Sequence, residues 1–192
     1  VRNVSEKFYS VNFLKYMPPT IFTKNIEEIK KFVKKYKKIV IKPIHGYGGK
    51  NILFVNKSIN QIKVLNYIKK FGHIMVQKFI PQVIKGDKRV FIINGLVKGA
   101  IQRVPRKGSF VSNLAQGGKA IETKLNYKEL KISKIVAKHL KKSQIFFAGI
   151  DLVSNYLIGD INVTSPTGLK NFNDLSGINL AKDFWNNLEK LK

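Results

Sequence analysis

Apolar residues recur at helical spacing in several stretches of the chain. In the clearest stretch, Ile26, Ile29, Phe32 and Val33 stand at i, i+3, i+6 and i+7, which places them on one face of a helix. The first stretch begins at Ser5, a residue type that caps helices, and a pair of prolines ends it. The predicted helices cover residues 5–16, 25–36, 61–71 and 127–142, and a further helix is expected from about Leu175.

Shorter apolar runs bounded by glycine, proline or asparagine predict β-strands. Asn94-Gly95 is the strongest turn signal, because this dipeptide accepts the positive φ angles of a tight hairpin. The predicted strands cover residues 39–42, 51–55, 74–79, 88–93, 96–103, 145–153 and 157–163. Hairpins and helices are mixed along the chain, so the pattern favours an α+β fold over a doubly wound parallel sheet.

The chain is strongly basic, with 36 Lys and Arg residues against 11 Asp and Glu residues and a formal net charge of +25. Such a charge is typical of proteins that bind nucleic acid or an anionic membrane. Only Arg2, Arg89, Arg103 and Arg106 are arginines, although arginine provides the bidentate contacts of many nucleic-acid binders. Because Lys, Asn and Ile all have A/T-rich codons, codon bias explains the lysine excess and leaves a modest role for an anionic substrate.

Composition limits the class of protein further. A length of 192 residues and a hydrophobic content of 44% are typical of a globular protein. The chain has no cysteine, which excludes disulfides, thiolate metal sites and cysteine nucleophiles. No stretch resembles a membrane span or a secretory signal, so we expect a cytoplasmic location. The first residue is Val1 rather than methionine, which indicates a fragment of a longer chain.

A glycine-rich turn, HGYGG at residues 45–49, follows soon after Lys42 and Pro43. Glycines let the backbone approach an anion closely, so that several N–H groups can face it. Lys42 could hold a phosphate beside them as a point charge. The spacing fits neither a Walker A loop nor a dinucleotide-binding fingerprint. An ordinary hairpin turn with a surface lysine is the alternative interpretation.

Three oxygen-bearing side chains, Asp151, Asp160 and Asn162, stand on the two strands predicted nearest the C-terminus. Asp160 and Asn162 alternate with Ile161, so they point to the same side of their strand. Carboxylate and amide oxygens suit Mg²⁺, and acidic residues are scarce in this chain. Without metal, close carboxylates are expected to raise one another's pKa. The alternative is a polar sheet edge that faces solvent.

Two of the four arginines stand at strand ends. Asp87 and Arg89 follow Gly86 at the start of one strand, and Arg103 ends the next. Their rarity favours anion contacts over a charged turn with an exposed arginine. Residues 104–119 are rich in Gly, Ser, Asn and Lys and predict a long functional loop.

Taken in order, these segments resemble the ATP-grasp part of bacterial glutathione synthetases. The resemblance covers essentially the whole chain and rests on IVIKPIHGYGGKNI, VQKFIP, KGDKRVFIINGLVKGAIQRVP, NLAQGGKA, GIDLV and DINVTSPTG. The most specific pieces are GDKRV, NLAQGG and INVTSPTG. The resemblance implies an α+β ATP-grasp fold whose two lobes, each with an antiparallel sheet, grip ATP between them. A lid lobe with the glycine turn would cover residues 1–80, and a catalytic lobe with the metal site would cover residues 81–192.

The resemblance also implies roles for individual residues. The implied ATP-binding residues are Lys7, Lys42, Gly46, Tyr47, Gly48, Gly49, Gln77, Lys78, Phe79, Ile80 and Asp87. The implied catalytic residues are Arg103 and Lys42, and the implied substrate-binding residues are Arg89, Asn113, Ser165 and Thr167. Asp151, Asp160 and Asn162 would hold two Mg²⁺ or Mn²⁺ ions. The loop at 104–119 would close over the reaction.

The implied activity is that of a glutathione synthase, which joins γ-glutamylcysteine to glycine through an acyl phosphate as ATP becomes ADP and phosphate. The implied full-length protein is a homo-oligomer that has no nucleic-acid or membrane partner. Asp160 stands where the family has glutamate, and the hairpin between Asp151 and Asp160 is one residue longer. The family's N-terminal domain, which helps bind the substrate, has no counterpart in these residues. The resemblance therefore does not imply that this fragment is active by itself.

Two alternatives stay open. Another ATP-grasp amino-acid or peptide ligase would share the nucleotide site but not the acceptor pocket. A basic, non-enzymatic nucleic-acid-binding module would explain the charge, although the basic residues lack the interleaved aromatic residues of a stacking platform. Polyanion binding without ATP affinity would favour the module.

Overall fold

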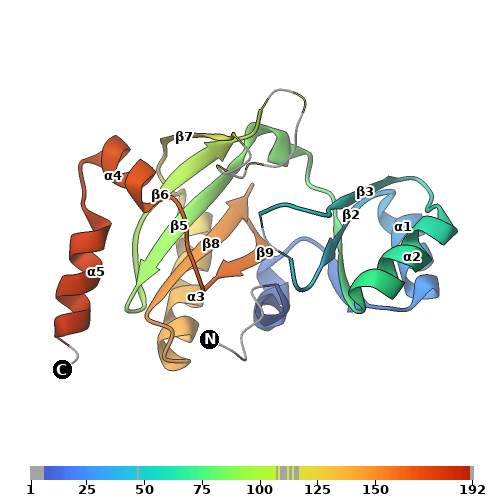
Figure 1. Ribbon diagram of the computed structural model, residues 1–192, viewed down its shortest axis with the longest axis horizontal. Helices are drawn as coiled ribbons and strands as arrows, with labels where there is room; N and C mark the ends of the chain where they lie inside the picture. Colours follow the sequence, from blue (N-terminus) through green and yellow to red (C-terminus); the bar gives the residue numbers. More distant parts are fainter. Residues whose placement is uncertain are drawn as a thin grey trace.

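The structure is a computed structural model and describes residues 7–46, 48–106, 108, 112, 114 and 117–190. Its strands form two antiparallel sheets, one of four strands and one of five, and helices pack against both (Figure 1). The α+β class predicted from the order of the elements is therefore confirmed.

The smaller sheet has the strand order β1-β4-β2-β3. Its lobe contains β1 (Thr20–Thr23), α1 (Ile26–Tyr36), β2 (Lys38–Pro43), β3 (Leu53–Asn56), α2 (Gln61–Phe71) and β4 (Ile74–Lys78). The two helices bury Ile29 and Val64 together with Ile41 of the sheet. Asn25 starts α1 because its side chain accepts a hydrogen bond from the Glu27 backbone at 2.8 Å.

The larger sheet has the strand order β7-β6-β5-β8-β9. Its strands are β5 (Asp87–Ile93), β6 (Leu96–Val104), β7 (Lys119–Glu122), β8 (Phe147–Val153) and β9 (Tyr156–Asn162). The helices of this part are η1 (Phe8–Tyr16), η2 (Pro81–Lys85), α3 (Tyr127–Lys142), α4 (Leu169–Ser176) and α5 (Leu180–Glu189), of which η1 and η2 are 3₁₀ helices.

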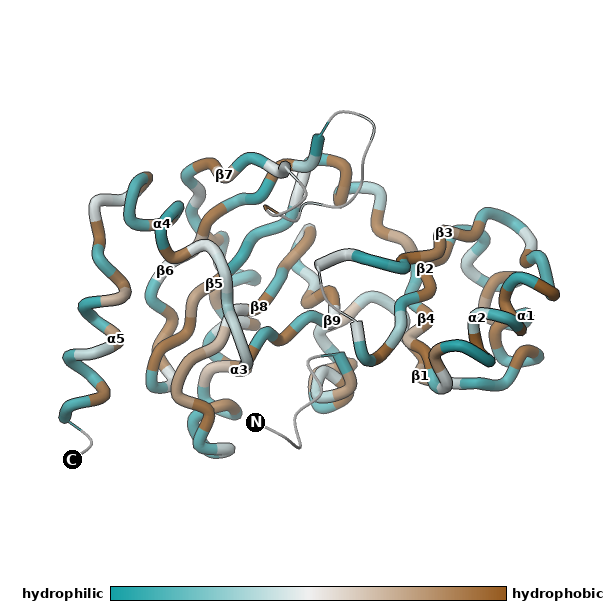
Figure 2. The backbone as a smooth tube through the Cα atoms, in the orientation of Figure 1, coloured by the Kyte–Doolittle hydropathy of each residue, from teal (hydrophilic) through white to brown (hydrophobic). Residues whose placement is uncertain are grey.

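Alternation along β5 separates the two faces of the larger sheet. Val90 and Ile92 belong to the core cluster that includes Val136 and Leu140 of α3. The alternate residue Phe91 packs against Phe172 of α4, with 5.5 Å between the ring centroids. In Figure 2, α5 alternates between hydrophilic and hydrophobic segments, as expected for a helix with one buried side. Asp87 and Arg89 stand in the same alternation as Phe91, so the charged residues share its face.

The 3₁₀ helix η1 packs against β9 of the larger sheet, although the strand that follows it belongs to the smaller one. Phe13 and Met17 lie in the larger core together with Met75 of β4. The two sheets fall on either side of residue 80, and Met75 and η1 connect them. The division into lobes at 1–80 and 81–192 stays a prediction.

Some predicted elements differ from the observed ones. The expected first helix is a 3₁₀ helix in its described part, and Phe13 leaves helical φ and ψ; Ser5 lies outside the described residues. The single helix expected near the C-terminus is two helices separated by Gly177 at a φ of 71°. The edge strands β1 and β7 were not predicted, because each has only four residues and no clear alternation.

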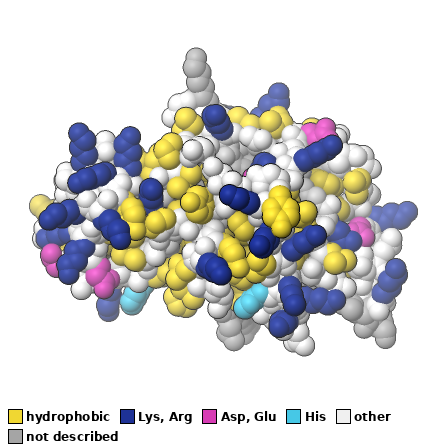
Figure 3. Space-filling view, turned by 180° about the vertical axis from the view of Figure 1, so that it is seen from behind, with side chains coloured by type: hydrophobic (Ala, Val, Ile, Leu, Met, Phe, Trp, Pro, Cys, Tyr) yellow, Lys and Arg dark blue, Asp and Glu magenta, His cyan; other side chains and the backbone are white. Residues whose placement is uncertain are grey.

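Lys and Arg side chains are spread over the face drawn in Figure 3, with hydrophobic groups between them. This distribution agrees with an excess of lysine along the whole sequence better than with one basic patch. None of the described helices combines the length and the apolar character that crossing a membrane requires.

Candidate functional site

A cleft of about 750 Å³ is lined by residues of both sheets. Its volume lies within the range of about 300–1,000 Å³ that is typical of ligand sites. The apolar lining includes Val40, Phe79, Val83 and Ile158. The charged lining residues are Lys7, Lys42, Lys50, Lys78, Asp87, Arg89, Arg103, Asp151 and Asp160.

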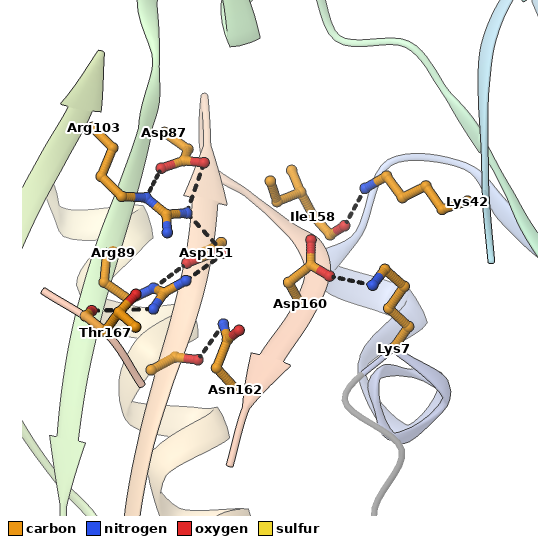
Figure 4. A network of polar contacts seen from close by, with 11 residues as sticks. Lys7, Lys42, Asp87, Arg89, Arg103, Asp151, Ile158, Asp160, Asn162 and Thr167 are labelled. Atoms are coloured by element: carbon orange, nitrogen blue, oxygen red, sulfur yellow. Dashed lines mark hydrogen bonds and ion pairs between the residues drawn. The ribbon is translucent and has the colours of Figure 1, made fainter. Parts of the chain in front are cut away.

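Two aspartates and two arginines form a connected cluster on the cleft face of the larger sheet (Figure 4). Arg103 Nε lies 2.6 Å from Asp87 Oδ1, and Arg103 Nη2 lies 2.8 Å from Asp151 Oδ2. Arg89 Nη2 donates to the same Asp151 oxygen at 3.1 Å, and its Nε donates to Oδ1. Asp151 therefore joins the two guanidinium groups.

The register of the sheet brings these residues together. Arg89 of β5 is opposite Asp151 of β8, and Asp87 is opposite Arg103 of β6. Directly opposed residues have neighbouring side chains on the same face, so each arginine meets a carboxylate across the strands. Gly149 leaves room for this arrangement, because a Cβ there would lie 2.8 Å from Cδ of Arg89.

The pKa values of the two aspartates are shifted in opposite directions. Burial raises the pKa of Asp87 to about 6, although Arg103 opposes the shift. Burial acts in the same sense on Asp151, but the positive charges of Arg103 and Arg89 outweigh it and lower the pKa of Asp151 to about 2. The prediction that neighbouring carboxylates would raise the pKa at Asp151 is therefore wrong, because it did not include the two arginines that contact this residue.

Asp160 and Asn162 stand on the same side of β9, and the residue between them, Ile161, is fully buried. Both line the cleft together with Asp151. The pairing of β8 with β9 is irregular here: Ile150 is opposite Ile161, whereas Leu152 is opposite Leu157. Three residues of β9 therefore face the single residue Asp151, which is a bulge.

Gly159 lies in this bulge at a φ of 89°, a conformation that favours glycine. A Cβ at Gly159 would lie 2.6 Å from Cε of Met75 and 3.1 Å from Cε of Met17. The bulge therefore lies directly on the hydrophobic contacts that connect the two sheets.

The oxygen donors present are chemically suitable for Mg²⁺. Asn162 donates its Nδ2 to the carbonyl of Gly149 at 3.1 Å, which leaves its Oδ1 as an acceptor. Asp151 and Asp160 supply carboxylates, although both form ion pairs with basic side chains. Among the described residues, no three His, Cys, Asp or Glu side chains form a candidate metal cluster. The predicted set has two carboxylates and one amide, and its metal role stays a prediction.

Lys7 reaches the cleft from the N-cap of η1, and Lys42 reaches it from β2. Lys7 Nζ lies 3.3 Å from Asp160 Oδ1 and also donates to the carbonyl of Gly46 in the glycine turn. Lys42 Nζ donates to the carbonyl of Ile158 at 2.9 Å (Figure 4). Burial lowers the pKa of Lys42, although the negative charge of Asp160 opposes this shift.

The glycine turn and residues 77–80, which run from the end of β4, were both predicted to bind ATP, and both line the cleft. Gly46, Gly48 and Gly49 lie in its wall, and residues 77–80 line it at the connection between the sheets. Gly48 and Gly49 have φ angles of 68° and 73°, which explains the need for glycine. Tyr47 lies outside the described residues.

The structure places most of the predicted substrate residues near the cluster. Ser165 and Thr167 line the cleft, and the carbonyl of Thr167 accepts a hydrogen bond from Arg89 Nη1 at 3.3 Å. Asn113 lies outside the described residues, as does much of the loop at 104–119. Their roles stay predictions.

Sequence reasoning missed the part of β9 that contacts Lys42. The carbonyl of Ile158, which lies in the bulged stretch of β9, accepts a hydrogen bond from Lys42. A glycine inside an alternating strand pattern, here Gly159, was the available signal of a bulge.

Comparisons with known proteins give one family and one fold. Residues 6–177 match the family described as prokaryotic glutathione synthetase, ATP-grasp domain. The glutathione synthetase of Bradyrhizobium diazoefficiens is 35% identical over 99% of this chain and 61% of its own length. That of Prochlorococcus marinus subsp. pastoris is 39% identical over 92% of this chain and 58% of its own length. The chain thus spans about three fifths of the curated relatives that it matches.

Solved structures share the fold at low sequence identity. D-cycloserine synthetase DcsG has a TM-score of 0.66 at 15% identity, with 86% of this chain and 64% of that chain covered. D-alanyl-alanine synthetase A from Vibrio cholerae has a TM-score of 0.61 at 14% identity, with 85% and 56% covered. These likenesses concern the fold alone.

Proposed function

We propose that this chain, which belongs to the prokaryotic glutathione synthetase ATP-grasp domain family, is the ATP-binding catalytic part of a carboxylate–amine ligase. The observation that carries the proposal is the cleft in which Lys7 and Lys42 lie opposite the cluster of Asp87, Arg89, Arg103 and Asp151. We propose γ-glutamylcysteine and glycine as its substrates in the full-length protein, and glutathione, ADP and phosphate as its products.

In the proposed reaction, a substrate carboxylate attacks the γ-phosphate of ATP and forms an acyl phosphate. The amine of the acceptor then displaces phosphate and forms the amide. Phosphoryl transfer depends mainly on positioning and on neutralising charge, which agrees with a cleft rich in Lys and Arg. Lys7 and Lys42 would bind the phosphates, and Arg103 would stabilise charge at the γ-phosphate.

Other residues would place the two remaining ligands. Arg89 would bind a carboxylate of the peptide substrate, and Ser165 and Thr167 would lie near the acceptor amine. The segment at 77–80, with Val40 and Ile158 nearby in the lining, would form the adenine pocket. Asp87 would contact the ribose. The long loop at 104–119 would exclude water from the acyl phosphate, which water would otherwise hydrolyse.

Asp151, Asp160 and Asn162 would hold divalent ions, and we propose two Mg²⁺ or Mn²⁺ ions. Bound ions of this kind would neutralise negative charge on the phosphates. The carboxylate and amide oxygens that line the cleft support this assignment, since the hydrogen bond from Asn162 to Gly149 uses its Nδ2 and not its Oδ1. The shorter side chain of Asp160, where the family has glutamate, must reach the ion from the bulged strand.

We further propose that the full-length enzyme is cytoplasmic, forms a homo-oligomer and binds neither nucleic acid nor a membrane. In this proposal residues 1–80 form a lid lobe and residues 81–192 form a catalytic lobe.

The nucleotide site can be tested by replacing Lys42 with methionine, which keeps much of the side-chain volume and removes the charge. Loss of a hydrogen bond to a charged group costs about 1.5–3 kcal/mol, so affinity for a non-hydrolysable ATP analogue should fall about 10–100-fold. Lys170→Met is the control, because the side chain of Lys170 is 86% exposed on α4. Equal affinities in the two variants would contradict the site.

The acceptor needs a separate assay. In the full-length protein, ATP-dependent phosphate release should require both γ-glutamylcysteine and glycine. Another ATP-grasp ligase would be supported if phosphate were released with a different peptide or amino acid but not with this pair. Strong polyanion binding without nucleotide affinity would support a nucleic-acid-binding module.

A further inference from the structure

Thr20 lies outside the cleft lining but next to Gln77, which is part of that lining. It stands on β1, the edge strand of the smaller sheet, and is directly opposite Gln77 of β4. Gln77 and Val40 are opposite each other on the other side of β4, and Lys42 follows Val40 by two positions. Thr20, Gln77 and Lys42 therefore project from the same face of three adjacent strands.

A chain of hydrogen bonds connects these side chains. Thr20 Oγ1 donates to the carbonyl of Pro18 at 2.7 Å. Gln77 Nε2 donates to Thr20 Oγ1 at 2.9 Å, and Lys42 Nζ donates to Gln77 Oε1 at 3.3 Å. The chain thus runs from a backbone carbonyl at the sheet edge to an ammonium group in the cleft.

The direction of this chain follows from the donors available. A hydroxyl group has one hydrogen, and that of Thr20 is directed to Pro18, so its oxygen can only accept from Gln77. Gln77 must then present its NH₂ group to Thr20 and its carbonyl oxygen to Lys42. The opposite amide orientation would place N–H groups against an ammonium, which is also a donor only.

Gln77 is only 2% exposed, and the Lys42 residue is 6% exposed. Burial of this kind makes polar partners important, because an unpaired ammonium has a high desolvation cost. An ammonium has three N–H groups, and Gln77 and Ile158 accept from Lys42 in the described structure. These two acceptors fix its position and leave one N–H group for a ligand in the cleft.

We propose that Thr20 is a positioning residue for the ATP phosphates: it orients the Gln77 amide, which in turn orients the Lys42 ammonium. The inference rests on the proposed role of Lys42 in phosphate binding. Thr20 does not line the cleft, so it acts only through the two residues between it and the ligand.

Thr20→Val tests this arrangement, because valine has nearly the same shape and lacks the hydroxyl group. Without that acceptor the Gln77 NH₂ group loses its hydrogen bond at the sheet edge, so the amide is held less firmly against Lys42. Affinity for a non-hydrolysable ATP analogue should therefore fall about fivefold, less than a direct charged contact would lose. Affinity for adenosine, which has no phosphate, should change by less than about twofold. Thr20→Ser should restore the affinity for the ATP analogue, because serine keeps the hydroxyl group.

Thr23→Val is a matched control on the same strand. Thr23 is 5% exposed, points to the other face of β1, and accepts a hydrogen bond from the Asn25 backbone at 2.9 Å. Its replacement should lower thermal stability but leave the ratio of ATP-analogue to adenosine affinity unchanged. This control separates a change in stability from a change in phosphate binding.

The outcomes distinguish the inference from the proposed function. If Lys42→Met weakens binding of the ATP analogue and Thr20→Val does not, Thr20 has no positioning role and the nucleotide site stands. An equal loss of ATP-analogue and adenosine affinity in Thr20→Val would also overturn the inference. If Lys42→Met leaves ATP-analogue affinity unchanged, both the proposed phosphate site and the inference fail.

Discussion

Replacing Asp151 with asparagine removes the charge that joins Arg89 to Arg103 and keeps the shape of the side chain. The side chain of Asp151 is 6% exposed, and the two arginines contact both of its oxygens. In the variant, Arg103 keeps its ion pair with Asp87. Arg89 keeps the carbonyl of Thr167 and an uncharged amide oxygen at position 151, but no carboxylate partner among the described residues.

The pKa of Asp151 gives the expected size of the effect. A carboxyl group lowered from 3.8 to about 2 favours the ionised folded state by about 2–3 kcal/mol. Removing one partner of a buried ion pair costs about 3–5 kcal/mol, because the other charge stays buried. We therefore expect Asp151→Asn to lower the free energy of unfolding by about 3 kcal/mol at pH 7, or the melting temperature by about 6–12 °C.

Urea unfolding at pH 7 measures this difference, with Asp174→Asn as the matched control. Asp174 forms an ion pair with Lys170 at 2.7 Å, but these side chains are 51% and 86% exposed. Exposed pairs contribute about 0–1 kcal/mol, so the control should be nearly as stable as the unmodified chain. A similar decrease in the free energy of unfolding in Asp151→Asn and Asp174→Asn would refute the reasoning.

The same variant has a defined pH dependence. Because the folded pKa of Asp151 is lowered, its stabilising contribution is present above the unfolded value near pH 4. The contribution is lost as the pH falls through about 2. The difference between the unmodified chain and Asp151→Asn should therefore narrow toward pH 2, and a constant difference would contradict the assigned cause.

Two further predictions concern Asp87 and the bulge. Because the pKa of Asp87 is raised, its contribution to stability is fully present below pH 4 and is lost as the pH rises through about 6. The free energy of unfolding should therefore fall less between pH 4 and pH 7 in Asp87→Asn than in the unmodified chain. The same fall in both proteins would contradict this prediction. Gly159→Ala should cost about 2–4 kcal/mol from its positive φ and the contact with Met75, and Gly177→Ala, where a Cβ meets nothing within 4 Å, should cost only about 1–2 kcal/mol. Equal losses in thermal unfolding would show that Met75 accommodates the added methyl group.

The sequence predicted most of the fold because local signals agreed with the final packing. The helices at 61–71 and 127–142 match α2 and α3, whose starts are capped by Asn60 and Asn126. The hairpin at Asn94-Gly95 forms with φ angles of 48° and 73°. The edge strand β1 has no comparable local signal, because its four residues become a strand through pairing with β4.

The residue types of the candidate site could be predicted, but their contacts could not. Alternation placed Asp160 and Asn162 on one side of β9, and the structure agrees. The ion pairs of Asp151 depend on the register of β5 with β8, which the sequence of either strand alone does not specify. Composition likewise did not indicate that Arg89 and Arg103 share a carboxylate.

The partners of Lys42 distinguish it from three other cations that line the cleft. Lys7, Arg89 and Arg103 each contact a carboxylate, whereas Gln77 and Ile158 offer Lys42 neutral oxygens. Burial consequently disfavours the charge of Lys42 and lowers its pKa. A polyanion in the cleft would add to the negative charge of Asp160, which already opposes this shift, and would favour the protonated form. Its hydrogen bonds to neutral oxygens, with no ion pair to Lys42 among the described residues, therefore suit a lysine whose direct ionic partner is a bound phosphate.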